Sequence, residues 1–252
     1  MFCKTYGHGQ RIFLAFHGWA GDHREFAAIA GRLPDDACWV SVDLPGYGNS
    51  PAPPVWDIGV ITEQINDELS GLLDTHDDIT LVGFCSGAVL GIELARKRPD
   101  AVKRMVMIDP FAFLPWYFKL FTLGEFGRRA YASTFMSPLG RNITDRVLSS
   151  MQAGDADFTG AFVEADHELI QNYLRLFASL DGRRVFSGFA IEVEIALGER
   201  TFGAVKKSVQ QIKRQWPEAR VHELARTGHL PLIKGARELR RIIFGQPCSP
   251  RD

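Results

Sequence analysis

Several features that mark particular protein classes are absent from the sequence. No apolar run approaches the length that crosses a membrane, and residues 1–6 carry no signal-peptide pattern. The 29 basic and 30 acidic residues leave a net charge of −1, without the basic excess of a protein that binds nucleic acid. We therefore expect no membrane span and no nucleic-acid partner.

Cysteine is scarce, and its spacing excludes further classes. The four cysteines form no Cys-x-x-Cys pair and no metal-ligand spacing; they are Cys3, Cys38, Cys85 and Cys248. No Gly-x-Gly-x-x-Gly motif follows the first expected strand, which disfavours a dinucleotide-dependent enzyme. We expect no metal, no cofactor, and a reducing, cytoplasmic setting.

The chain does contain short apolar runs that alternate with amphipathic helical segments. Strands are predicted at 11–16, 39–44, 79–82, 102–108, 191–197 and 220–224. Strands that alternate with helices form a mostly parallel sheet covered on both faces, so we predict an α/β fold. After the first strand, Asp22 is expected to cap a helix, with Glu25 at the third helical position as in a capping box.

The third predicted strand leads directly into a helix through the sequence Gly-Phe-Cys-Ser-Gly. Such a sharp turn closes only when the residues two before and two after its apex are very small. With Cys85 at the apex these neighbours are Gly83 and Gly87. With Ser86 at the apex one neighbour would be Phe84, which would clash. The pattern therefore indicates a nucleophile at Cys85 rather than a merely buried cysteine.

A helical and aromatic segment interrupts the alternation between the fourth and fifth of these strands. It predicts a division into a core at 1–110, a helical lid insertion at 111–187, and a second part of the core at 188–252. Its aromatic residues crowd into a short region, and they are Phe111, Phe113, Trp116, Tyr117, Phe118, Phe121, Phe126, Tyr131 and Phe135. A small lid cannot bury so many rings by itself, so we expect some to face the active-site cleft or a lipid-like ligand.

Four motifs in this order resemble the α/β-hydrolase superfamily, and they cover nearly the whole chain. They are His17-Gly-Trp, Asp43-Leu-Pro-Gly-Tyr-Gly-Asn-Ser, Gly83-Phe-Cys-Ser-Gly and Gly228-His229-Leu-Pro. Within this superfamily, the chain resembles small carboxylesterases of the pimeloyl-ACP methyl ester esterase type, which also carry His-Gly-Trp. The resemblance implies the α/β-hydrolase fold, with a mostly parallel central sheet, helices on both faces and an inserted helical lid. It is weak evidence for a substrate, because this fold hosts many chemistries.

The resemblance implies roles for five positions. Cys85 is the expected nucleophile at a helix N-terminus, and His229 is the expected general base on the loop after the last strand. The backbone N–H groups of Ser86 and Trp19 are expected to bind the oxyanion. His17 is similar to the family's structural histidine and receives no catalytic role.

For the acid of the triad, the sequence leaves three alternatives. Thr201 stands where the family usually has an aspartate. We rank Asp109, at the end of the strand after the elbow helix, as the first candidate. A Cys–His pair without an acid comes second, because a thiolate forms more readily than an alkoxide. Glu199, on the usual loop but two residues early, comes third.

These residues predict an acyl hydrolase or acyltransferase, of the esterase or thioesterase class, that works through a thioester on Cys85. The expected substrate is an ester or thioester of an apolar acyl group. Acyl-CoA and acyl-carrier-protein thioesters are the preferred donors, because attack by a thiolate on a thioester exchanges two similar leaving groups. The alternative is a non-catalytic ligand-binding or scaffold protein that kept the fold with a degenerate triad.

Overall fold

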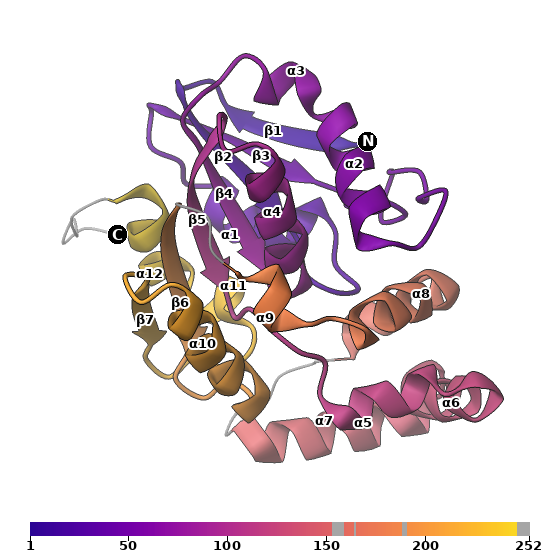
Figure 1. The fold of residues 1–252 in the computed structure, drawn as a ribbon. Helices are drawn as coiled ribbons and strands as arrows, with labels where there is room; N and C mark the ends of the chain where they lie inside the picture. The colour runs from indigo at the N-terminus through magenta and orange to yellow at the C-terminus, as the bar shows by residue number, and fades with distance from the viewer. Residues whose placement is uncertain (153–158, 164, 188–190, 246–252) are drawn as a thin grey trace.

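The structure is a computed structural model that describes residues 1–152, 159–163, 165–187 and 191–245. Seven strands form one sheet in the order β1-β3-β2-β4-β5-β6-β7 (Figure 1). Only the β1–β3 pair is antiparallel, and all other neighbours run parallel. The strands are β1 (Cys3–Gly7), β2 (Arg11–Phe16), β3 (Ala37–Val42), β4 (Ile79–Phe84), β5 (Val102–Ile108), β6 (Glu192–Gly198) and β7 (Arg220–Leu224).

All six predicted strands are present, with ends displaced by no more than two residues. The sequence did not predict β1, which lies at the edge of the sheet and pairs along β3 from Cys3 opposite Val42 to Gly7 opposite Cys38. Only one edge of such a strand is bonded and most of its side chains are not buried. It therefore lacks the apolar run that identifies the inner strands.

Helices cover both faces of the sheet, as predicted, and the side chains of β2 alternate between the two cores. Leu14 packs in the core that contains Ile61 of α2 and Ala88 of α4. Phe13 packs in the opposite core, with Leu239 of α12. The helices outside the β5–β6 connection are η1 (His23–Phe26), α1 (Ala27–Ala30), α2 (Ile58–Glu68), α3 (Ser70–Leu73), α4 (Ser86–Lys97), α10 (Gly203–Gln215), α11 (Pro231–Lys234) and α12 (Ala236–Phe244).

The connection from β5 to β6 is helical over its described residues, and Figure 1 shows α5 to α8 gathered beyond one end of the sheet. Its rings form a small core of their own, centred on Tyr131 and Phe135 and joined by Trp19 from the body of the protein. Other rings stay outside this core, since Trp116 is 73% and Phe126 is 66% exposed. The elements are α5 (Trp116–Lys119), η2 (Leu120–Thr122), α6 (Gly124–Tyr131), η3 (Ala132–Met136), α7 (Pro138–Gln152), η4 (Gly160–Phe162), α8 (His167–Ala178) and α9 (Gly182–Val185).

The carboxyl ends of the parallel strands bring several predicted site residues to one edge of the sheet. Asp43 follows β3, Cys85 follows β4 and Asp109 follows β5, while the loop with Trp19 follows β2. Ligands of open α/β sheets bind at this edge. Among the described residues, no helix combines the length and apolar character that a membrane crossing requires.

Candidate active site

Cys85 occupies the apex of a sharp turn between β4 and α4. Its backbone has φ 49° and ψ −111°, a region that non-glycine residues rarely adopt and that costs of order 1–3 kcal/mol. A Cβ atom on Gly83 would lie 2.5 Å from the Cα of Ala88, and one on Gly87 would lie 2.2 Å from the carbonyl oxygen of Phe16. The two glycines therefore allow the close approach that places Cys85 at the first turn of α4, where the helix dipole favours negative charge.

His229 lies beside Cys85 on the loop after β7. Its Nδ1–H donates to Asp109 Oδ2 at 2.8 Å, and its side chain is hydrogen-bonded to that of Cys85. The ring packs between Phe84 and Phe202, and the side chain is 18% exposed. Burial lowers the pKa of His229, but the hydrogen bonds and charges of Asp109 and Cys85 outweigh burial and raise this pKa to about 10.

Asp109, the first-ranked acid, is fully buried and held on both carboxylate oxygens. The N–H of Gly198 donates to Oδ1 at 3.0 Å, and the hydroxyl of Thr201 donates to Oδ2 at 2.7 Å. Thr201 Oγ1 also lies 3.4 Å from Nδ1 of His229. The residue at the usual acid position thus touches both the acid and the base.

Glu199, the third-ranked acid, is occupied elsewhere. Its carboxylate accepts the backbone N–H of Arg226 at 2.6 Å, which ties the loop after β6 to the loop after β7. The structure therefore brings Cys85, His229 and Asp109 together and directs Glu199 to a backbone contact.

The segments that carry the two backbone groups expected at the oxyanion lie next to Cys85. Ser86 follows Cys85 as the first residue of α4 and is buried. The loop with Trp19 lies against the elbow, because a Cβ atom on Gly18 would be 3.4 Å from Cβ of Cys85. Both loops therefore border the Cys85 side chain, as an oxyanion hole requires.

The Trp19 side chain joins this loop to the helical insertion. Its indole N–H donates to the carbonyl oxygen of Ile170 in α8 at 3.2 Å. Its ring meets Phe118, Phe135 and Phe162 edge to face, with centroids 5.3–6.2 Å apart. Trp19 thus packs within the aromatic core of the insertion instead of merely bordering the sheet.

Sequence reasoning missed two residues of this site, Thr201 and Glu25. In the sequence Thr201 marks only the missing aspartate, although a hydroxyl beside a buried carboxylate is a natural donor to it. Glu25 was assigned to a capping box with Asp22. Asp22 does cap η1, but the carboxylate of Glu25 accepts the N–H of Gly18 at 2.8 Å instead. No sequence signal distinguishes these two partners for Glu25.

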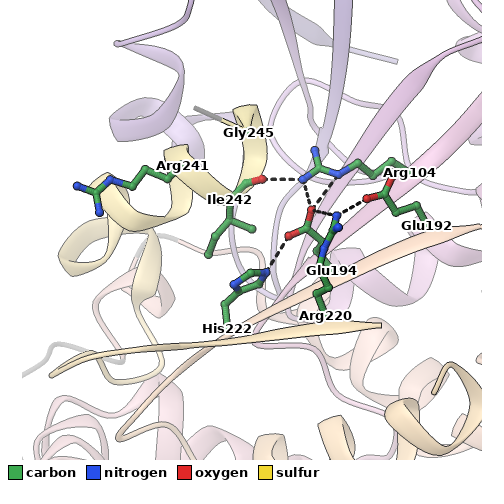
Figure 2. A pocket seen from close by; sticks show the side chains of 8 residues that line it. All are labelled: Arg104, Glu192, Glu194, Arg220, His222, Arg241, Ile242 and Gly245. Atoms are coloured by element: carbon green, nitrogen blue, oxygen red, sulfur yellow. Dashed lines mark hydrogen bonds and ion pairs between the residues drawn. The ribbon is translucent and has the colours of Figure 1, made fainter. Parts of the chain in front are cut away.

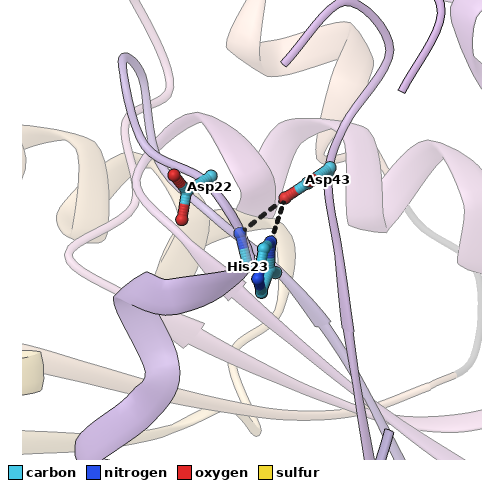
Figure 3. A group of neighbouring side chains, drawn as sticks. All are labelled: Asp22, His23 and Asp43. Atoms are coloured by element: carbon cyan, nitrogen blue, oxygen red, sulfur yellow. Dashed lines mark hydrogen bonds and ion pairs between the residues drawn. The ribbon is translucent and has the colours of Figure 1, made fainter. Parts of the chain in front are cut away.

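Asp22, His23 and Asp43 place three potential metal-ligand atoms within 4.8 Å of one another (Figure 3). The carboxylate of Asp43 is already hydrogen-bonded to the neighbouring loops. Asp43 Oδ1 accepts both the backbone N–H and the Nδ1–H of His23, at 2.8 and 2.7 Å, and Oδ2 accepts the N–H of Asn49 at 2.9 Å. We therefore read the group as a link between the loops after β2 and β3 and assign it no metal.

A charged surface pocket lies at the amino ends of β5 to β7, away from Cys85 (Figure 2). Glu194 is at its centre and pairs with Arg104 at 2.5 Å, Arg220 at 2.9 Å and His222 at 2.8 Å. Burial raises the pKa of Glu194, but these hydrogen bonds outweigh burial and lower it below its usual value. Because Arg104, Arg220 and His222 all contact Glu194, we assign the pocket no ligand.

The chain resembles known proteins in both sequence and fold. The model of the alpha/beta hydrolase family matches residues 12–241. A pimeloyl-[acyl-carrier protein] methyl ester esterase of Chromobacterium violaceum is 32% identical over 110 residues, which are 43% of this chain and 40% of the esterase. Lipase LipV of Mycobacterium tuberculosis is 32% identical over 104 residues, 40% of this chain and 38% of the lipase. The chain thus covers about two fifths of the length of these relatives.

Solved structures agree on the fold. An esterase from Exiguobacterium antarcticum superposes with a TM-score of 0.78 at 14% identity, covering 97% of this chain and 94% of its own. A putative non-heme bromoperoxidase from Mycobacterium tuberculosis has a TM-score of 0.77 at 15% identity, covering 97% and 94%. The predicted α/β-hydrolase fold, with a mostly parallel sheet and helices on both faces, is confirmed.

Proposed function

The chain belongs to the alpha/beta hydrolase family, and we propose that it transfers acyl groups through a covalent thioester on Cys85. The observation that supports this most is the contact series from Cys85 to His229 to Asp109, with Asp109 2.8 Å from the imidazole. A nucleophile, a base and a group that orients the base are the parts that covalent acyl transfer needs. The esterases and lipase among its relatives support the same class of reaction.

In the proposed first step, the sulfur of Cys85 attacks the carbonyl carbon of an ester or thioester. The N–H groups of Trp19 and Ser86 stabilise the oxyanion. Because Nδ1–H of His229 is engaged by Asp109, Nε2 is the atom that exchanges protons with the reacting groups. It donates a proton to the leaving alkoxide or thiolate as the carbon–oxygen or carbon–sulfur bond breaks, which leaves the acyl group on Cys85.

In the second step, water or another acceptor attacks the acyl thioester. The neutral imidazole of His229 removes a proton from the acceptor, and the bond between the acyl carbon and Cys85 breaks. The released acid or transferred acyl product carries the oxygen or sulfur of the acceptor. The proton taken from the acceptor stays with the Cys85–His229 pair, which is then ready for the next cycle.

The chemistry of the leaving group favours thioesters as donors. When a thiolate attacks an oxygen ester, the intermediate must expel an alkoxide while the better leaving thiolate of Cys85 can depart instead. With a thioester, both leaving groups are thiolates and the exchange is nearly balanced. We therefore propose acyl-CoA or acyl-carrier-protein thioesters as substrates.

We also propose that residues 111–187 act as a lid that selects apolar acyl groups. The supporting contacts are those of Trp19, which follows Gly18 beside Cys85 and packs its ring against three rings of the insertion, Phe118, Phe135 and Phe162. The insertion thereby lies next to the proposed oxyanion hole. There, an acyl chain that extends from the reacting carbonyl carbon would meet apolar side chains.

The test compares matched oxygen esters and thioesters of one acyl group in the natural protein and in Cys85→Ser. We expect the natural protein to favour the thioester, and Cys85→Ser to shift the ratio of kcat/KM values toward the oxygen ester. Each reaction is repeated with an added thiol or amine to detect acyl transfer. Faster hydrolysis of the oxygen ester by the natural protein, with no product from any added acceptor, would leave a cysteine esterase and refute transfer from thioesters.

A further inference from the structure

The peptide that carries the Trp19 N–H is oriented by His17. The ring Nε2 of His17 accepts the N–H of Leu44 at 3.0 Å, so the ring proton lies on Nδ1, 2.8 Å from the carbonyl oxygen of Gly18. Burial lowers the pKa of His17 to about 4, which keeps the ring neutral. In a trans peptide the carbonyl and the N–H point in opposite directions. A hydrogen bond to the Gly18 carbonyl therefore sets the direction of the Trp19 N–H.

Glu25 holds the preceding peptide of the same loop. Its Oε2 accepts the N–H of Gly18 at 2.8 Å, and its carboxylate lies so close to Gly21 that a Cβ atom there would be 2.6–2.8 Å from it. The carboxylate thus occupies the inside of the turn that the N–H of Gly21 closes on the carbonyl of Gly18 at 3.2 Å. Within this turn Ala20 has φ 63°, a strained value for alanine.

The Glu25 carboxylate is not required to cap the helix that begins at His23. Asp22 Oδ1 alone accepts the N–H of Arg24 at 2.8 Å and caps η1. On the other side of the turn, a Cβ atom on Gly18 would meet the ring of Phe84 at 2.9 Å and Cβ of Cys85 at 3.4 Å. The main chain at residue 18 is therefore enclosed between the Glu25 carboxylate and the elbow.

We propose that Glu25 is a positioning residue of the oxyanion hole, which acts through Gly18 to aim the Trp19 N–H at the substrate oxygen. This rests on the proposed function, in which that N–H stabilises the oxyanion on attack by Cys85. Without an acceptor at Glu25, the turn loses one of the two contacts that hold the peptides on either side of Gly18. The strained backbone at Ala20 can then relax and turn the Trp19 N–H away.

The experiment compares acylation with alkylation of Cys85 in Glu25→Leu and Glu25→Gln. Acylation by p-nitrophenyl butanoate forms an oxyanion, whereas alkylation by iodoacetamide does not. Leucine has no acceptor for the Gly18 N–H, while the glutamine amide oxygen keeps one at the same length. We expect Glu25→Leu to lower the acylation rate on the order of 10²-fold, the loss typical of one oxyanion donor, with little change in KM. The alkylation rate of Glu25→Leu stays within about twofold of that of the natural protein, which is a minor change in activation free energy. Glu25→Gln recovers most of the acylation rate.

The outcomes separate this inference from the proposed function. Equal acylation by Glu25→Leu and the natural protein would overturn the role of Glu25 alone. Parallel losses of acylation and alkylation in Glu25→Leu would also overturn it, since they indicate a damaged fold or nucleophile. A failure of Glu25→Gln to recover acylation while alkylation stays normal would show that the Gly18 contact is not what matters. If neither p-nitrophenyl butanoate nor an acyl thioester acylated Cys85 of the natural protein, the proposed function would fall, and the role of Glu25 with it.

Discussion

Replacing Asp109 by asparagine should lower the acylation rate by as much as ~10⁴-fold, or about 5.5 kcal/mol in the activation barrier. The structure explains why the amide cannot substitute by rotating. Gly198 N–H donates to Oδ1 at 3.0 Å, so an asparagine would keep its carbonyl there and place its NH₂ group at the position of Oδ2. The Thr201 hydroxyl, 2.7 Å from that position, can rotate to accept from the NH₂ group. Both neighbours thus favour the orientation that presents a donor to His229.

A donor facing Nδ1 of His229 forces the proton of a neutral imidazole onto Nε2. This tautomer cannot accept a proton from the thiol of Cys85 or from an attacking acceptor. Loss of the carboxylate also removes a hydrogen bond and a charge that raise the pKa of His229, so this pKa should fall from its value of about 10. The pH dependence of iodoacetamide alkylation measures that change, because a histidine that has lost its proton no longer stabilises a neighbouring thiolate.

A second substitution turns this loss into a sharper test. Because Thr201 Oγ1 lies 3.4 Å from Nδ1 of His229, an aspartate at 201 should be able to reach the imidazole. We expect the Asp109→Asn/Thr201→Asp double variant to recover part of the rate, measured by stopped-flow release of p-nitrophenol. Glu199→Gln is the matched control and should change the rate little, since Glu199 bonds to the backbone of Arg226. If the acylation rate of Asp109→Asn stays within about threefold of that of the natural protein, the role of Asp109 is refuted and a Cys–His pair is favoured.

Three further predictions concern the nucleophile, the partly buried Glu25 and the insertion. Cys85→Ala should abolish turnover with an unchanged circular dichroism spectrum, whereas Ser86→Ala should be mild because only the Ser86 backbone is used; the opposite pattern would place the nucleophile at Ser86. Burial raises the pKa of Glu25 from 4.5 to about 7, with Asp22 adding to this effect and the Gly18 hydrogen bond and His229 opposing it. A carboxyl group whose pKa is raised by folding stabilises the fold below pH ~4.5. This contribution to the free energy of unfolding, at most ~3 kcal/mol, is lost as the pH rises toward 7. Glu25→Gln should therefore gain stability relative to the natural protein between these pH values in urea titrations, and parallel profiles would contradict it. Finally, kcat/KM should rise with acyl chain length by at most ~0.8 kcal/mol per methylene before levelling off, while a flat profile would argue against an apolar acyl site.

The features that the sequence predicted well are those set by local chemistry. The elbow follows from sterics within five residues, because Gly83 and Gly87 leave room only for an apex at Cys85. The position of Asp109 at a strand end follows from the apolar run before it. The partners of Glu25 and Thr201 depend instead on how separate loops approach one another, and neither residue type nor spacing records that approach.

The central claim, a covalent acyl intermediate on Cys85, is tested most directly by mass spectrometry of the protein quenched with acid during turnover of an acyl thioester. The claim predicts that the intact mass rises by one acyl group, that peptide mapping places the group on Cys85, and that Cys85→Ala carries none. An acyl group on Ser86 or elsewhere, or undiminished turnover by Cys85→Ala, would contradict it.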